Sequence, residues 1–541
     1  ISTLFAGLLS DWMGRKKLML LSGLLFVISV PVIALAHGYG PLVFGRLLQC
    51  ISAGLIGVVV PLYLAECLGA ASRGKGTGIF QWLLTLGIVA AAIIGYYFSF
   101  RVEEVKQLGD PAKLLAFEDM AWRSIFWVSL PPGILFVLGS FVVAESPRWL
   151  FRRGRKDAAR AALLRSRTEE QAERELTEME ETAAAEKAKS AGAKTKESLL
   201  RRKYIIPFIL ACIILACNQT TGINSIIGYN TNILIQAGLG DNQAHLGYVI
   251  LTLVNFLITP ACVMLVDRKG RKFFLSLGSA GIVVSLLCVG FLFHKTEKLR
   301  VDVKSAVQAM VSTNQTLTFA FDRATKDKLL ATAGAAGEVI SNQPTSLVLI
   351  YSYGGFRAAT SPESSDDATA MPINITRENC VPHNKVLAFF SNPFANLNAA
   401  RTASLKIENA LITPVPGTEN GWLTAIFLFT FMAFFAIGPG VCVWLALSEL
   451  MPTRIRSNGM SIALVINQGV STTIAAIFLP TVGKYGYSTM FFAFAGCTVV
   501  YFITAAFFLP ETKGKTLEEI EEHFEGIKKL ELSSATQGND T

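Results

Sequence analysis

The sequence GLLSDWMGRKK at residues 7–17 returns, about half a chain later, as VMLVDRKGRK at residues 263–272. The two stretches share the pattern Asp-x-x-Gly-Arg-Lys, and each one joins two apolar runs. A duplicated unit of this kind is typical of membrane transporters that are built from two related halves, with a site between the halves at mid-depth. The repeat therefore predicts a two-part membrane protein.

The composition supports a chain with many membrane spans. Of its 541 residues, 52% are apolar and only 16% are charged, and the mean hydropathy is +0.45. A soluble domain carries about 25% charged residues, so this balance excludes a disordered chain and argues against a large soluble enzyme. The net charge of +9 is interpreted as basic cytoplasmic loops rather than as a surface for nucleic acid. Eight of the nine cysteines lie in apolar runs, and Cys380 alone cannot build a disulfide framework.

Ten apolar runs approach or reach the roughly 20 residues that a membrane span needs. They lie at about 18–36, 41–65, 77–100, 122–143, 204–230, 245–266, 273–293, 422–447, 459–482 and 487–509. A shorter run, at residues 1–10, indicates that the numbering begins inside a helix. We expect twelve spans in the complete protein. Lys and Arg gather in alternate loops, and the positive-inside rule puts those loops and the tail after Pro510 in the cytoplasm.

Two long polar segments divide the chain. The first is rich in Ala, Glu, Lys and Arg, which favours short surface helices, and it separates the spans into two groups. The second lies outside the membrane by the charge count and holds two Asn-x-Thr sequons. The expected regions are an N-terminal bundle without its first helix (1–147), a cytoplasmic helical linker (148–203), a C-terminal bundle in two parts (204–293 and 421–510), an extracytoplasmic insert (294–420) and a cytoplasmic tail (511–541).

Several motifs occur in an order that resembles the sugar porter family of the major facilitator superfamily. They are Asp11-x-x-Gly14-Arg15-Lys16, Gly45-Arg46, Pro61-Leu62-Tyr63-Leu64-Ala65-Glu66, Arg73-Gly74, Trp122-Arg123, Glu145-Ser146-Pro147-Arg148-Trp149-Leu150, Gly222-Ile223-Asn224, Asp267-Arg268-Lys269-Gly270-Arg271, Gly438-Pro439-Gly440 and Pro510-Glu511-Thr512-Lys513-Gly514. The match covers nearly the whole chain except the insert. It implies an all-α polytopic fold of two six-helix bundles, a place in a cell membrane (plasma or bacterial inner), and transport of a hexose, pentose or polyol by alternating access.

Amide side chains inside predicted spans are costly unless they have partners, so they are candidate functional residues. An amide both donates and accepts hydrogen bonds, which matches the hydroxyls of a sugar. The resemblance aligns Gln81, Asn218, Gln219, Asn224, Asn255 and Trp444 with positions that contact sugar in the family, and Asn467 joins them as a further candidate amide. For each amide, the alternative is a group that only holds helices together. Asn218 stands where the family usually has Gln, and Gly228-Tyr229 replaces paired tyrosines.

Acids and arginines at the cytoplasmic ends of the spans can form ion pairs between neighbouring helices. The resemblance implies that such pairs latch the two halves together when the transporter faces outward; the alternative is simple anchoring of helix ends at the membrane interface. The candidate residues of this gating network are Asp11, Arg15, Glu66, Arg73, Glu145, Arg148, Asp267, Arg271, Glu449 and Arg456. In proton-coupled members, the residue that matches Arg46 faces an acid on the first helix, so we expect proton symport, with uniport as the alternative.

Two other functions remain open at this stage. A sugar sensor on the same scaffold is expected to carry a long signalling tail, whereas the tail here, from Glu511 to Thr541, is short. An enzyme in the insert is disfavoured because the insert has no metal-ligand spacing, phosphate loop or nucleophile motif. We expect no cofactor, no metal, no catalytic residue and no nucleic-acid partner. The expected partners are a small sugar or polyol, protons and the lipid bilayer.

Overall fold

A computed structural model describes residues 2–67, 70–192, 202–360, 363–365, 372–385, 387–388, 392, 394–451, 456–513 and 524. Within these residues, ten helices are long and apolar enough to cross a membrane. They coincide with the ten runs predicted from the sequence. The chain is an all-α polytopic protein in its membrane part, as expected, and the insert departs from this by forming β-sheets.

In the part of the N-terminal half that the structure describes, six helical segments precede the linker. They are α1 (Ser2–Met13), α2 (Arg15–Ala34), α3 (Tyr39–Cys67), α4 (Ala70–Lys106), α5 (Pro111–Val128) and α6 (Leu130–Val142). Together, α5 and α6 make one membrane-length span. The helix α2 packs against both α3 and α6. Its buried residues, which include Leu18 and Met19, form a small core with Leu55 and Val59 of α3.

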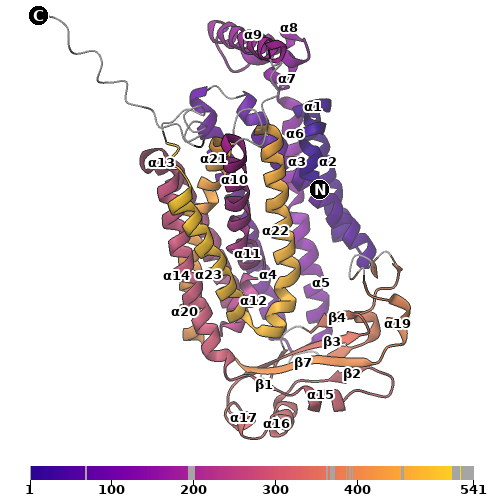
Figure 1. Ribbon diagram of the computed structural model, residues 1–541. Coiled ribbons are helices and arrows are strands. Elements are labelled where there is room, and N and C mark those ends of the chain that lie inside the picture. The colour runs from indigo at the N-terminus through magenta and orange to yellow at the C-terminus, as the bar shows by residue number, and fades with distance from the viewer. Residues whose placement is uncertain are drawn as a thin grey trace, which may run out of the picture.

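Three helices follow outside the bundle: α7 (Pro147–Arg152), α8 (Lys156–Leu164) and α9 (Glu169–Gly192). Figure 1 shows them together at one end of the molecule, which we call the linker end. The side chain of Ser146 accepts a hydrogen bond from the Trp149 amide and so caps α7. Alternating charges in α8 and α9 form exposed ion pairs such as Arg160–Glu169, which is typical of a solvated helix pair.

The C-terminal half has two parts on either side of the insert. The first contains α10 (Arg202–Thr220), α11 (Ile223–Gly228), α12 (Asn230–Gln236), α13 (Asp241–Lys269) and α14 (Arg271–Glu297). The second contains α20 (Thr418–Ile437), α21 (Pro439–Leu450), α22 (Arg456–Tyr485), α23 (Tyr487–Ile503) and a π-helical turn, η2 (Thr504–Phe508). The two parts share one core, because α14 packs against both α20 and α23.

The break between α10 and α11 has a local cause in the sequence. Gly222 has a φ of 81°, which favours glycine, and a Cβ there would lie 2.3 Å from the ring of Phe494. The helix therefore stops at Gln219–Thr220 and restarts at Ile223. This break is what turns the side chain of Asn224 toward α22, as described below.

The insert forms its own folded unit at the opposite end of the bundle, which we call the insert end (Figure 1). Its main sheet is antiparallel in the order β1-β7-β3-β4, with β5 also paired to β3, and a second sheet pairs β2 with β6. The strands are β1 (Val301–Asp302), β2 (Leu317–Phe319), β3 (Thr345–Tyr353), β4 (Phe356–Ala359), β5 (Glu363–Ser364), β6 (Ile373–Ile375) and β7 (Leu405–Pro414). Short helices lie between them: α15 (Lys304–Ala309), α16 (Arg323–Ala331), α17 (Ala335–Glu338), the 3₁₀ turn η1 (Arg377–Asn379) and α19 (Leu397–Thr402).

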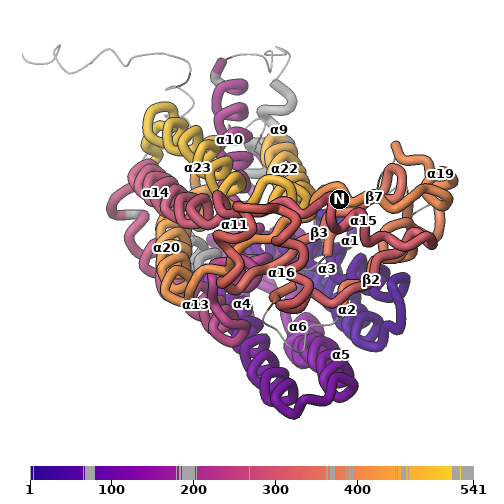
Figure 2. Tube along the Cα trace, turned by 90° about the horizontal axis from the view of Figure 1, so that it is seen from below, coloured from indigo at the N-terminus to yellow at the C-terminus, as the bar shows by residue number. Residues whose placement is uncertain are grey.

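The insert has a hydrophobic core separate from that of the bundle. Figure 2 views the molecule from the insert end, and there the insert lies across the middle of the bundle. The described hydrogen bonds to the bundle go to the C-terminal half: Ser346 Oγ donates to Gln236 Oε1, and Asn409 Nδ2 donates to the carbonyl of Gly483. Cys380 is half-buried in this core, and burial raises the pKa of its thiol.

Candidate functional site

A connected group of amide side chains joins α10, α11 and α22 in the C-terminal half. Gln219 Nε2 donates to Asn467 Oδ1 at 3.1 Å, and Asn224 Nδ2 donates to Gln219 Oε1 at 2.8 Å. Gln219 and Asn467 are buried, whereas Asn224 is exposed. The cluster thus has a fixed buried end and an accessible end. We call Gln219, Asn224, Asn467 and Ser471 the amide cluster.

Ser471 is a member that the sequence analysis missed. Its Oγ accepts a hydrogen bond of 2.9 Å from Asn224 Nδ2. The signal that could have found it is its spacing, because Ser471 follows Asn467 by four residues and therefore lies on the same face of α22.

Two further buried amides, on α10 and α12, have side-chain atoms for which the described residues supply no hydrogen-bond partner. Within the described residues, Asn218 Oδ1 has no hydrogen-bond partner, and neither do the two side-chain polar atoms of Asn230. Both side chains are at least 96% buried. An unsatisfied buried amide is costly and is usually met by an ordered water or a ligand. Asn230 was not predicted, because none of the motifs quoted above includes it.

Gln81 and Asn255 lie on a different seam, where the two halves touch. Trp82 of α4 stacks on Phe256 of α13, with ring centroids 5.2 Å apart and planes 12° apart. Gln81 and Asn255 are the residues just before these two rings, and both are half-buried. Among the described hydrogen bonds, none links either side chain to the amide cluster. Trp444 of α21 is 40% exposed, so its ring is available for contact.

Arg46 lies exposed on α3, and its guanidinium contacts α5 and its own helix. Its Cζ lies 4.8 Å from the ring centroid of Phe126, and its Nη1 donates to Gln49 Oε1 at 3.2 Å. An intramembrane guanidinium normally meets an acid or water. The described residues show no ion pair of Arg46.

At the linker end of the N-terminal half, the predicted gating residues form a buried cluster. The Arg15 guanidinium meets the Glu66 carboxylate through two hydrogen bonds of 2.8 Å, and Ser146 Oγ donates to Glu66 Oε2 at 2.5 Å. Glu145 accepts hydrogen bonds from the backbone N–H groups of Arg15 and Lys16, which begin α2. Arg15 is only 2% exposed. These contacts fasten α2, α3 and the start of the linker together.

The C-terminal half repeats this arrangement group for group. Arg271 Nη2 lies 3.0 Å from Glu449 Oε1, and Thr512 Oγ1 donates to Glu449 Oε2 at 2.5 Å. Glu511 accepts from the backbone N–H groups of Arg271 and Lys272, which begin α14. The carboxylates fit because Gly14 and Gly270 have φ values of 95° and 93°, and a Cβ at either glycine would collide with Glu145 or Glu511. Ser146, Glu511 and Thr512 belong to this network, although they were quoted only as motif residues.

The remaining predicted gating residues contribute less. Asp11, whose own side chain is exposed, forms an ion pair of 3.0 Å with the buried Arg15, and Arg148 is exposed. The side chains of Arg73, Asp267 and Arg456 lie outside the described residues. Every described ion pair of the network stays within one half. The described polar contacts between the halves are at the insert end, where Ser99 Oγ of α4 lies within hydrogen-bond distance of Asp241 Oδ2 (2.8 Å) and Asn242 Oδ1 (3.1 Å) of α13.

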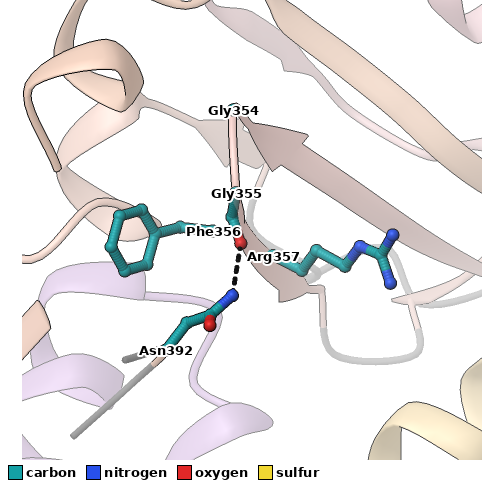
Figure 3. Close-up of a pocket in the computed structure, with 5 residues that line it drawn as sticks. All are labelled: Gly354, Gly355, Phe356, Arg357 and Asn392. Carbon is teal, nitrogen blue, oxygen red and sulfur yellow. Dashed lines mark hydrogen bonds between the residues drawn. The ribbon is translucent and has the colours of Figure 1, made fainter. Parts of the chain in front are cut away.

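The insert holds a cavity of about 360 Å³ beside the β3–β4 hairpin, apart from the amide cluster (Figure 3). It is lined by Gly354, Gly355, Phe356, Arg357 and Asn392. The amide of Asn392 already has partners, because Nδ2 donates to the Gly355 carbonyl in the turn of the hairpin and Oδ1 accepts from the Phe394 N–H. Within the described part of the chain, no group of three His, Cys, Asp or Glu side chains could hold a metal ion.

Comparisons with known proteins agree with this architecture. The family described as "Sugar (and other) transporter" matches residues 1–322 and 406–524, which leaves out much of the insert. The chain is 25% identical over 522 residues to the glucose transporter GlcP of Staphylococcus epidermidis, covering 95% of this chain and 84% of that protein. It is 26% identical over 534 residues to the human proton myo-inositol cotransporter, covering 97% of this chain and 74% of the cotransporter.

A solved structure of similar fold is the xylose transporter XylE from E. coli in a partially occluded inward open conformation. The TM-score is 0.60 at 17% identity, and the match covers 95% of this chain and 85% of XylE. XylE belongs to the major facilitator superfamily, so the two-bundle fold implied by the sequence motifs is confirmed.

Proposed function

The chain belongs to the sugar (and other) transporter family, and from that premise we propose that it binds a sugar or polyol at the amide cluster while carrying it across a membrane. It is a multi-pass membrane protein, and its relatives are transporters of sugars and inositol rather than sensors. The observation that carries the proposal is the hydrogen-bonded chain from Asn467 through Gln219 to the exposed amide of Asn224.

The chemistry of the cluster suits a molecule with many hydroxyls. A buried amide held by a second amide keeps its orientation, so it presents a fixed donor or acceptor to a substrate. Asn224 and Ser471 supply the accessible groups, and the exposed ring of Trp444 offers a surface for the C–H face of a sugar ring. Gln81 and Asn255 complete the site from the seam between the halves, when the halves close around the substrate.

The two gating clusters support transport by alternating access. Each cluster fastens helix ends within its own half, so each half moves as one body. The halves contact each other along α4 and α13, where the rings of Trp82 and Phe256 stack. In this proposal, the two rings shift relative to each other as the halves move. In this proposal the latch between the halves adds ion pairs in the outward-facing state, with Arg73, Asp267, Arg148 and Arg456 among its members.

The proposed topology puts the linker end and the tail in the cytoplasm and the insert outside. The basic residues of the linker end support this orientation, because positive loops stay on the cytoplasmic side. The proposed regions follow the boundaries expected from the sequence, at 1–147, 148–203, 204–293, 294–420, 421–510 and 511–541. The membrane is a plasma membrane or a bacterial inner membrane.

Proton coupling is part of the proposal and rests on Arg46. Within the described residues, Arg46 contacts an aromatic ring and an amide. In this proposal an acid faces the guanidinium, and the positive charge of Arg46 then acts on the protonation of that acid. The human relative is named a proton myo-inositol cotransporter, and XylE is described as a proton:xylose symporter. Protonation of the facing acid would release Arg46 and permit the change of state.

The test uses purified protein in liposomes. Binding and uptake of a hexose, a pentose and myo-inositol are measured side by side, with and without an inward proton gradient. We expect saturable uptake of at least one of them, faster with the gradient and lowered by a protonophore. Binding without any uptake, in correctly inserted protein, would favour the sensor instead. Uptake at the same rate with and without the gradient would refute proton coupling, but it would not contradict the proposed binding site.

A further inference from the structure

The two halves differ in the contacts of one lysine, although that lysine has the same position in both copies of the repeated sequence. Lys16 and Lys272 are the second residues of α2 and α14, and both follow the repeated Gly-Arg. Lys16 Nζ donates to the carbonyl of Phe141, at 2.8 Å. The equivalent carbonyl belongs to Phe507, since each phenylalanine precedes the capping glutamate by four residues. In the described part of the chain, the Lys272 ammonium has no hydrogen bond or ion pair.

A change in the backbone accompanies this difference. In the N-terminal half, the N–H of Val143 donates to the carbonyl four residues back, at Gly139. In the C-terminal half, the N–H of Leu509 donates to the carbonyl five residues back, at Thr504, and residues Thr504–Phe508 form a π-helical turn. The extra residue widens the last turn of the helix, and such turns are frequent at functional sites.

Beside this turn lies a groove of about 490 Å³ between α14 and α23. Its floor comes from one face of α14, at Phe273, Ser276, Leu277 and Ala280, and from Phe502 and Ala506 on the other side. Phe273 and Leu277 are 49% and 39% exposed, so the groove faces the surroundings of a membrane-spanning helix pair. Lys272 and Glu511 stand at its linker end.

We propose that this groove binds an anionic phospholipid of the leaflet on the linker side, with one acyl chain against the apolar floor and the phosphate on Lys272. The charge at the groove mouth is suitable for such a headgroup. The last turn of α13, just before α14, carries Arg268 and Lys269, both exposed. Glu511, the acid at the mouth, is already held by the backbone N–H groups of Arg271, Lys272 and Lys513. An ammonium at the edge of hydrocarbon needs an anion or water, and a lipid phosphate supplies the anion.

The pseudo-symmetry of the chain provides a matched control. Lys16→Ala removes a lysine from the same position of the repeat, but that lysine is already bound to a carbonyl. Ser276→Trp keeps the charge and fills the apolar floor instead. Lys272→Arg keeps a cation at the mouth. Together with Lys272→Ala, these three variants separate a specific site from the general attraction of a basic surface.

The experiment measures binding of dioleoyl phosphatidylglycerol to the full-length purified protein by native mass spectrometry, with dioleoyl phosphatidylcholine and inorganic phosphate as comparison probes. We expect one phosphatidylglycerol to bind preferentially, about fivefold more weakly to Lys272→Ala and to Ser276→Trp, and unchanged to Lys16→Ala and Lys272→Arg. Equal losses in Lys16→Ala and Lys272→Ala would overturn the proposal, as would no loss in either groove variant. Inorganic phosphate that binds with the same dependence on Lys272 would identify a phosphate site rather than a lipid site.

Discussion

The linker ends of the two halves show the same chemistry in different surroundings. Arg15 and Glu66 have side chains that are 2% and 9% exposed, whereas those of Arg271 and Glu449 are 13% and 25% exposed. The hydroxyl that supports each glutamate and the carboxylate that caps each following helix are conserved between the halves. Since water can replace a lost partner only where it reaches the site, equal contacts should contribute unequally to stability.

The largest expected effect comes from Arg15→Ala. This change leaves the Glu66 carboxylate buried without its cation, which costs about 3–5 kcal/mol. The matched variant, Arg271→Ala, exposes Glu449 to water and should cost on the order of 1–2 kcal/mol. Thermal unfolding of the detergent-purified proteins measures the loss of stability in both variants. Unfolding is monitored as the loss of the monodisperse peak with rising temperature. If Arg271→Ala were the more harmful change, burial would not govern the two clusters.

The middle of the molecule breaks the symmetry between the halves, because the amide cluster lies only on helices of the C-terminal half. Gln219→Ala removes a donor and an acceptor together, so sugar binding should weaken by roughly 5- to 150-fold, which corresponds to about 1–3 kcal/mol. Gln81→Ala removes a side chain outside the cluster and should fall near the low end of that range. Isothermal titration with the transported sugar gives both values.

A suitable control for the amide variants is Thr473→Ala. Thr473 lies two residues from Ser471 on α22, and its hydroxyl donates to Gly469 of its own helix. This variant should bind sugar as the parent does. If Gln219→Ala and Gln81→Ala also bind as tightly as the parent, the amides only hold helices together, and the proposed site is wrong.

A smaller difference is expected between the two supporting hydroxyls. Ser146→Ala removes a hydrogen bond to Glu66 and also the cap of α7, so we expect a loss of about 1–3 kcal/mol. Thr512→Ala removes only the bond to Glu449 among the described contacts, and we expect about 1 kcal/mol. The same unfolding assay compares them. Identical losses would show that the cap contributes nothing measurable.

The features that were predicted from the sequence are those that are repeated in it or that extend over many consecutive residues. The ten spans follow from their length and apolar composition, and the corresponding places of Arg15 and Arg271 at the starts of α2 and α14 follow from the duplicated Asp-x-x-Gly-Arg-Lys pattern. The hydrogen-bond partners of the site residues were harder to predict. Asn467 was proposed from its residue type alone, and the partners that hold it became visible only when α10 and α22 were brought together. Ser471 is too common a residue type to stand out in a span.

The sheet of the insert was not predicted at all. Its strand β3 reads TSLVLIYSY and is buried along nearly its whole length, so it lacks the strict alternation that marks a half-exposed strand. Pairing with β7 joins residues about sixty positions apart, which local patterns do not encode. The π-helical turn at Thr504–Phe508 was not predicted either, because the residue types there do not distinguish it from an α-helical turn.

The smallest expected effect tests the most visible asymmetry. The N-terminal half passes from α2 to α3 through the short connection at residues 35–38, whereas the C-terminal half places the whole insert between α14 and α20. The two ends of the insert meet, because Val301 pairs with Ile412 in the sheet. A deletion of residues 301–414 with a short glycine-serine joint therefore needs no rearrangement of the bundle.

We expect this deletion to change sugar affinity by no more than about twofold, because the insert has its own core and its described hydrogen bonds to the bundle are the two at the insert end. Affinity is measured by titration and uptake in liposomes, in protein shown to be inserted and monodisperse. The control is a variant that keeps the insert but loses one anchor, Asn409→Ala. If the deletion abolishes binding while Asn409→Ala leaves it intact, the insert shapes the site, and the two halves are not functionally complete without it.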